Sequence, residues 1–236
     1  LSSTQAIALG TSQVSALTAE QLTSMETVDL AQLSTDAIVS LSASQVKALT
    51  TGQVVAMSTA QVASLTTDQV KSLTTEQVAA LETVDLVELS SNQIQALAAS
   101  SVSQMTTGQV AALKTDQLNA LTTAQVRSLT TAQVVALGTA QAKALGTTQV
   151  SAFTVESVAA LETADLAQLS TESIAGLSAN QVKALTTAQV VALGTSQVSA
   201  LTTGQVAALT TAQASVMETV DLAALDTAQI RAVTAS

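Results

Sequence analysis

Residues 129–137 read Leu-Thr-Thr-Ala-Gln-Val-Val-Ala-Leu, and the same nine residues recur at 185–193. Outward from this stretch, an apolar residue recurs at every eighth position from Leu1 to Val233, with no insertion or deletion. With that residue as position one, the consensus octad is Leu-Thr-Thr-x-Gln-Val-x-Ala, and position six is always aliphatic. So strict a register is typical of repeat proteins, in which each unit buries its apolar face against its neighbours.

Two start signals place a helix in the octad. Thr or Ser at position two, followed three residues later by Gln, forms a capping box, as in Thr130 with Gln133 and Thr186 with Gln189. Positions one and six then become the apolar pair that staples the chain across the helix start. Both signals predict a helix that begins just after position two.

The charges are sorted in the same direction. Among the 17 acidic residues, all except Glu88 lie at positions two, four or five, at the predicted helix start. Among the seven basic residues, all except Lys114 lie at position seven, near the predicted helix end. The helix dipole favours this order by about 0.3–1 kcal/mol for each charge, and a strand has no comparable dipole.

We therefore expect an all-α solenoid of short helices, one of roughly six residues in each octad. A continuous helix is disfavoured, because eight residues overshoot two turns by about 80° and would spread the Leu residues around its surface. Stacked octads bury them instead, with roughly 3–4 octads in each superhelical turn. The alternative is a β-solenoid with ladders of Thr, Val and Gln, against which stand the sorted charges and the abundant Ala.

Four octads carry Asp in place of Gln at position five and begin with Glu at position two. At intervals of seven, ten and seven octads they supply the pairs Glu26 and Asp29, Glu82 and Asp85, Glu162 and Asp165, and Glu218 and Asp221. With about 3.4 octads in each turn, all four would lie along one edge of the solenoid. These eight residues are the candidate binding edge. Capping that complements the helix dipole is the favoured explanation of their spacing, and calcium at their carboxylates is a further alternative.

The chain is expected to be a single continuous solenoid, 1–236, of about 29 octads. The segment 41–57 recurs with few changes at 177–193, which indicates growth by duplication. Neither end carries a polar capping unit, and residues 234–236 read as the start of a further octad. We therefore expect a fragment of a longer array.

Composition argues against most chemistry. The chain has no His, Cys, Trp, Tyr or Pro and a single aromatic residue, Phe153, so we expect no catalytic site, no cofactor and no metal centre. The net charge of −10 disfavours nucleic acid and anionic lipid as partners. Polar residues interrupt every octad, so no membrane insertion is expected.

Two resemblances follow from the octad. The stretch at 129–137 resembles the opening helix of TAL-effector repeats, which begin Leu-Thr-x-x-Gln-Val-Val-Ala, but the resemblance stops after one octad and does not imply DNA recognition. The whole chain resembles the Thr/Gln/Ala octad arrays of very large bacterial surface or secreted proteins, which are described as adhesins or haem-utilisation proteins. No haem site is expected here, because His, Cys and Tyr are absent.

This resemblance implies a secreted or cell-surface location. We expect a non-catalytic spacer, stalk or scaffold whose main partners are the neighbouring repeats of the same chain. The alternative is a solenoid that binds a protein or glycan ligand and contributes to adhesion.

Overall fold

The computed structural model describes residues 2–234, so Leu1 and most of the partial octad at the C-terminal end lie outside it. These residues form 29 short α-helices and no β-strand, so the all-α prediction is confirmed and the β-solenoid alternative is wrong. The helices are α1 (Ser3–Ile7), α2 (Thr11–Ser15), α3 (Ala19–Thr23), α4 (Thr27–Leu30), α5 (Thr35–Val39), α6 (Ala43–Ala48), α7 (Thr51–Ala56), α8 (Thr59–Ser64), α9 (Thr67–Ser72), α10 (Thr75–Ala80), α11 (Thr83–Leu86), α12 (Ser91–Ala96), α13 (Ala99–Gln104), α14 (Thr107–Ala112), α15 (Thr115–Ala120), α16 (Thr123–Ser128), α17 (Thr131–Val135), α18 (Thr139–Ala144), α19 (Thr147–Ala152), α20 (Val155–Ala160), α21 (Thr163–Leu166), α22 (Thr171–Ala175), α23 (Ala179–Ala184), α24 (Thr187–Ala192), α25 (Thr195–Ser199), α26 (Thr203–Ala207), α27 (Thr211–Ser215), α28 (Thr219–Ala224) and α29 (Thr227–Thr234).

Each helix begins where the capping box predicts. At α9, Thr66 has extended backbone angles, and its Oγ1 accepts from the backbone N–H of Gln69 at 3.2 Å. The Oε1 of Gln69 accepts from the backbone N–H of Thr66 at 2.8 Å in return. The same reciprocal pair opens α6, α7, α16, α23 and α24, among other helices. The bases at position seven lie in the last helical turn: Lys47, Lys71, Arg127, Lys143, Lys183 and Arg231. The predicted start of each helix and the predicted placement of the basic residues near the helix ends are therefore confirmed.

The helix ends at the next position one. Leu65, with φ −54° and ψ 134°, still donates its N–H to the carbonyl of Val62 at 3.2 Å, but its ψ angle turns the chain out of the helix. The following N-cap, Thr66, is also extended, and these two residues redirect the chain into the next helix. No residue among 2–234 has a positive φ, so this bend requires neither Gly nor Pro.

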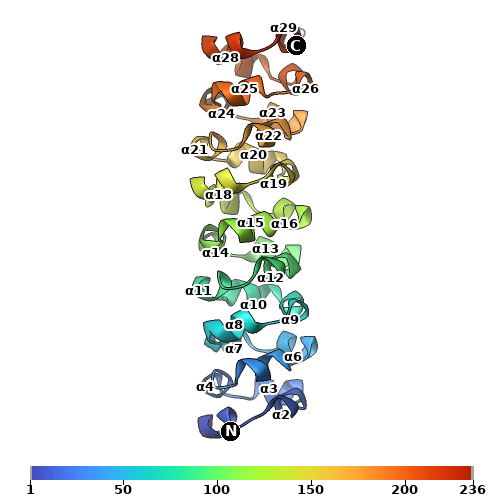
Figure 1. The fold of residues 1–236 in the computed structure, drawn as a ribbon, viewed down its shortest axis with the longest axis vertical. Coiled ribbons are helices and arrows are strands. Elements are labelled where there is room, and N and C mark those ends of the chain that lie inside the picture. The colour runs from blue at the N-terminus through green and yellow to red at the C-terminus, as the bar shows by residue number, and fades with distance from the viewer. Residues whose placement is uncertain (1, 235–236) are drawn as a thin grey trace. The chain divides into compact units, whose positions relative to one another are not determined.

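The contacts divide the chain into two compact units, Leu1–Ala120 and Leu121–Ser236. Within each unit a helix packs against the helix three places further along the chain, as α7 does against α10 and α20 against α23, which gives the layers seen in Figure 1. Side-chain hydrogen bonds also join residues 28 to 31 positions apart. A superhelical turn therefore holds between three and four octads within each unit. Continuity of the array across the two units stays a prediction from the unbroken octad register.

The core of each unit is built from positions one, five and six. Leu at position one and Val at position six are buried, as in Leu65 and Val70, whereas Ala at position eight is only half-buried, as in Ala56. Burial of one such Leu or Val side chain contributes about 1.5–3 kcal/mol, so many similar increments hold the helices together. Position-five Gln is also buried: Gln53, Gln61 and Gln69 are each 2% exposed.

The polar side chain of Gln can be buried at position five because its carboxamide finds hydrogen-bond partners there. The Nε2 of Gln69 donates to the carbonyl of Ile38 at 2.8 Å and to the carbonyl of Leu41 at 2.8 Å, in the preceding turn of the superhelix. Its Oε1 is occupied by the N-cap of its own helix. One carboxamide therefore caps its own helix and bonds that helix to the turn below it.

Candidate functional site

The four octads with Asp at position five, called the Asp octads below, form helices α4, α11, α21 and α28, whose N-caps are Glu26, Glu82, Glu162 and Glu218. None of these Glu side chains makes a capping hydrogen bond, and all four are exposed. The Asp residues of the same octads, Asp29, Asp85, Asp165 and Asp221, are buried, with at most 4% of their surface exposed. The eight candidate residues thus divide into four exposed Glu and four buried Asp, and their role as a binding edge stays a prediction.

Two of the buried aspartates accept a hydrogen bond from a hydroxyl 26 residues earlier. Ser3 Oγ donates to Asp29 Oδ1 at 2.9 Å, and Thr59 Oγ1 donates to Asp85 Oδ1 at 2.6 Å. The octad register contains a signal for this pairing, since the partner lies at position three of the octad three places earlier. The sequence analysis did not detect it, because capping alone explained the spacing of the carboxylates.

Asp165 differs from Asp29 and Asp85. Its Oδ2 is buried and has no hydrogen-bond partner among residues 2–234. Burial raises the pKa of the Asp165 carboxyl above its ordinary value, and the negative charge of Glu162 raises it further. A buried acceptor without a donor is unusual in a native structure.

Within each unit, one helix lies between the two Asp octads. In the first unit, α8 bonds to the end of α4 through Gln61, whose Nε2 donates to the carbonyl of Leu33 at 2.7 Å, and it bonds to α11 through Thr59. In the second unit, Gln197 of α25 donates to the carbonyl of Leu169, just after α21, at 2.7 Å, and α25 packs against α28. The seven-octad interval therefore corresponds to two superhelical turns in both units, as predicted from the spacing.

The two pairs belong to one duplicated segment. Residues 26–89 and 162–225 align without a gap, and both begin with Glu-Thr-Val or Glu-Thr-Ala followed by Asp-Leu-Ala-Gln-Leu. Asp165 corresponds to Asp29, and Asp221 corresponds to Asp85. The chain thus contains internal counterparts against which each position of the Asp octads can be compared.

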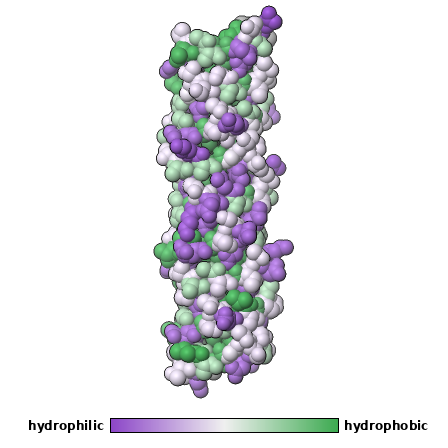
Figure 2. Space-filling view, viewed as in Figure 1, coloured by the Kyte–Doolittle hydropathy of each residue, from purple (hydrophilic) through white to green (hydrophobic). Residues whose placement is uncertain are grey.

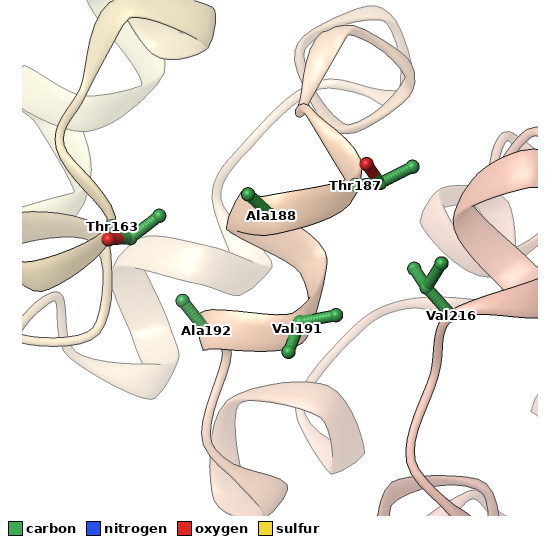
Figure 3. A pocket seen from close by; sticks show the side chains of 6 residues that line it. All are labelled: Thr163, Thr187, Ala188, Val191, Ala192 and Val216. Carbon is green, nitrogen blue, oxygen red and sulfur yellow. The ribbon is translucent and has the colours of Figure 1, made fainter.

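A shallow groove of about 460 Å³ lies beside α21 in the second unit (Figure 3). Val191 is the largest apolar side chain exposed in it, with 45% of its surface accessible. The groove is lined by Thr163, Thr187, Ala188, Val191, Ala192 and Val216. None of these residues is charged, and the exposed Glu162 and Glu218 lie within two residues of Thr163 and Val216 along the chain. The groove is therefore apolar, and its nearest charges in the sequence are acidic.

A second groove, in the first unit, has a different character. Lys47 and Lys71 both line it, together with hydroxyl-bearing residues that include Thr74 and Ser100. The two lysines belong to α6 and α9, which pack against each other. On the face seen in Figure 2, hydrophilic and apolar side chains are interspersed.

No group of three or more Asp and Glu side chains comes together among residues 2–234 in a way that could hold a metal ion. No helix in the same part of the chain is long and apolar enough to cross a membrane.

Taken together, one helix in each octad, the contacts at three helices' distance and the repeated Gln bridge define a helical repeat protein. The ALTTAQ repeat family model matches residues 22–59, 52–83, 78–115, 110–147, 118–155, 158–195 and 183–211. These matches span well over half of the chain, which therefore belongs to the ALTTAQ repeat family. No curated protein matches the chain.

Proposed function

We propose that this chain is a non-catalytic structural repeat region that acts as a spacer, stalk or scaffold. The observation that carries the proposal is the recurring Gln bridge, which within each unit attaches one turn of the superhelix to the previous one through the same 28-residue hydrogen bond. A structure that repeats one local interface can change its length by whole turns without a new fold. That property suits a part whose task is to hold other parts at a set distance.

We further propose that it belongs to a large bacterial surface or secreted protein. The support for this setting is the resemblance of its octads to the arrays of such proteins. An antibody raised against the chain tests the location directly. Staining of intact cells of the source organism, or its recovery from their culture medium, is the expected result, and staining only after the cells are permeabilised would overturn the proposal.

Rigidity within a unit tests the spacer role. The chain has no Cys, so Ser12→Cys and Gly108→Cys introduce two exposed labelling sites in the first unit without a competing thiol. Electron–electron double resonance between spin labels at these sites should give a narrow distance distribution. A flexible linker of the same length would give a broad one, and that result would contradict a spacer.

Deletion of residues 34–89 sharpens the test. It removes seven octads, joins Leu33 to Ser90 in register and corresponds to two turns. A spacer should keep its helical circular dichroism and show a shorter, equally narrow label distance. A deletion four residues longer, 34–93, is the matched control, because it puts every later Leu and Val out of register and should unfold the stack.

A second candidate function, the binding of a protein segment, is favoured by the apolar groove beside α21. The partner that fits its chemistry is a segment with apolar side chains for Val191 and Val216 and basic side chains for the flanking Glu162 and Glu218. An exposed apolar surface whose lining residues have acidic neighbours in the sequence favours such a segment over an acidic one.

A labelled amphipathic peptide of Leu and Lys tests this second function by fluorescence anisotropy. Val191→Ser removes apolar contact area and should weaken binding by about 5–30-fold. Val39→Ser is the matched control, because Val39 occupies the same octad position and is 41% exposed in the other unit. No binding at all, or an equal loss in both variants, would reject the groove as a docking site.

A further inference from the structure

The position-five side chain has opposite hydrogen-bonding character in the Gln octads and the Asp octads. Gln189 of α24 donates through its Nε2 to the carbonyls of Val158 at 2.9 Å and Leu161 at 2.8 Å. The ionised carboxylate of Asp165, at the same octad position in α21, can only accept. Asp165 therefore cannot bond its helix to the carbonyls of the preceding turn as Gln189 does.

Asp29 and Asp85 offset this loss by accepting from a hydroxyl. Ser3 and Thr59 supply the donors, at 2.9 Å and 2.6 Å. Asp165, although 1% exposed, retains a buried Oδ2 without a partner among the described residues. An ionised carboxylate that is buried and lacks donors costs stability, whereas a protonated carboxyl carries an O–H that can itself donate.

The surroundings of Asp165 supply little positive charge. The carboxylate of Glu162, the N-cap of the same helix, repels the negative charge of Asp165. Of the helices packed against α21, α18 carries the exposed Lys143 and α24 carries no charged residue, and α25, which is bonded to the end of α21, carries none either. The neighbours along the chain, α20 and α22, add the exposed Glu156 and Glu172.

We propose that residues 162–169 form a pH-sensitive layer of the solenoid, which packs more stably once the Asp165 carboxyl takes up a proton. The neutral carboxyl removes the buried charge and its repulsion from Glu162. It also provides a donor at the position where the Gln octads place the carboxamide of Gln. Acidification therefore strengthens this layer.

The direction in which pH changes the stability of this layer follows from the linkage between proton binding and folding. Burial and Glu162 hold the pKa of Asp165 in the folded chain above its unfolded value. A group with a raised folded pKa favours the folded state fully at pH values below the unfolded pKa, which is about 3.9 for Asp. That contribution is lost as the pH rises through the folded pKa, so the layer should become more stable as the pH falls from 7 towards 4.

Histidine, the side chain that ordinarily titrates between pH 5 and 8, does not contribute in this interval. The chain has no His. The nearby Glu156 and Glu172 keep their charge further into acid, because a hydrogen bond to the residue's own backbone N–H, and then hydroxyls from Thr154 and Ser170, lower the pKa of each carboxyl.

Hydrogen exchange of the α21 amides, corrected for the intrinsic pH dependence of exchange, tests the proposal. The amides of Leu166 and Ala167, bonded to the carbonyls of Glu162 and Thr163, report on this layer. In the unmodified chain we expect their protection to rise as the pH falls from 7 to 4, by up to about tenfold for each pH unit below the folded pKa of Asp165. In Asp165→Asn, which holds a neutral side chain of the same shape, protection at pH 7 should be higher and no longer rise in acid.

Asp29→Asn is the matched control. Asp29 is the duplicated counterpart of Asp165 and already accepts from Ser3, so this substitution should leave the pH response at 162–169 intact. Absence of a rise in the unmodified chain, or an equal rise in Asp165→Asn, would overturn the proposal. If Asp165→Asn loses its helical circular dichroism, the carbon-13 titration of the Asp165 carboxyl in the unmodified chain decides. A midpoint at or below the ordinary value of about 3.9 would overturn it.

Discussion

The Nε2 of Gln77 donates a 2.7 Å hydrogen bond to the carbonyl oxygen of Leu49, which lies 28 residues earlier in the chain. The Oε1 of the same carboxamide accepts from the backbone N–H of Thr74 at 2.8 Å. Gln53, Gln109 and Gln189 make the same 28-residue link, at 2.8 to 2.9 Å. In these octads the Gln that caps the helix is thus also the side chain that attaches it to the previous turn, so stability is spread over many similar links.

The hydroxyl that accompanies a buried Asp should contribute measurably to stability. Thr59→Val keeps the shape of the side chain but removes the donor to Asp85, which lies 2.6 Å away. We expect the free energy of unfolding at pH 7 to fall by about 1–3 kcal/mol, because a buried carboxylate loses a hydrogen bond. Thr51→Val, at the first position of α7, is the matched control for urea unfolding. A loss of equal size in both variants would show that the hydroxyl bond contributes nothing.

Capping at α10 should affect both stability and the titration of Glu76. Thr74→Ala removes the N-cap hydroxyl that accepts from Gln77 and should cost about 1 kcal/mol. A hydrogen bond to its own backbone N–H, followed by bonds to the hydroxyls of Thr74 and Thr75, lowers the pKa of Glu76. The substitution should therefore raise that pKa part of the way towards 4.5, and carbon-13 titration measures it.

The lowered pKa of Glu76 also makes the stability of the folded chain depend on pH. Its contribution is present above the unfolded pKa and is lost as the pH falls through the lower folded pKa. Thr74→Ala should diminish that acid-side loss. An unchanged Glu76 titration would mean that the Thr74 hydroxyl does not reach the carboxylate.

Gly176 is the one glycine among the described residues whose replacement by Ala meets a close obstacle. A Cβ at this position would overlap Thr147 Cγ2, although the backbone angles of Gly176 suit any residue. We expect Gly176→Ala to destabilise the second unit by about 1–3 kcal/mol. Thr147→Ser, which removes that methyl group, should recover most of the loss in the double variant.

Gly52→Ala serves as the control for this cycle. Its new Cβ would meet nothing nearer than 4.0 Å, and its duplicated counterpart, residue 188, is already Ala. A gain of up to about 1 kcal/mol is expected from helix propensity. If Gly176→Ala also stabilises the chain, the close approach of α19 and α22 is wrong.

Most of the fold could be predicted from the sequence, because the signals that start and end each helix are local. The capping box at Thr130 and Gln133, the position-seven bases and the aliphatic residues at positions one and six all fall where they were expected. The number of octads in a turn was constrained by the intervals between Asp octads, and the contacts within each unit agree with it.

The contacts between turns were harder to predict, because they join residues 25 to 31 positions apart and leave no local signal. The second role of Gln, donation to the previous turn, was missed for this reason. The ion pair between Glu88 and Lys114, the two charges that break the sorting rule, was missed for the same reason. Their side chains lie 3.2 Å apart although the residues are 26 positions apart in the chain. Both are about half exposed, so the pair contributes at most about 1 kcal/mol.

The candidate edge illustrates the same limit. The replacement of Gln by Asp at position five identified the four Asp octads in the sequence. It could not reveal that Asp29 and Asp165 are buried while Glu26 and Glu162 are exposed. Burial at position five depends on the turn packed against it, and the apolar groove beside α21 arises from three segments that are separate in the sequence.

The most direct test of the Gln bridge is urea unfolding of Gln77→Leu compared with Gln21→Leu. Both residues cap their own helices, but Gln77 is buried and bonded to the turn of Leu49, whereas Gln21 is exposed. We predict that Gln77→Leu lowers the free energy of unfolding by about 1–3 kcal/mol more than Gln21→Leu, because it leaves buried carbonyls of the previous turn without this donor. Equal losses in the two variants would show that Gln acts only as a cap and would contradict the account of how the octads are held together.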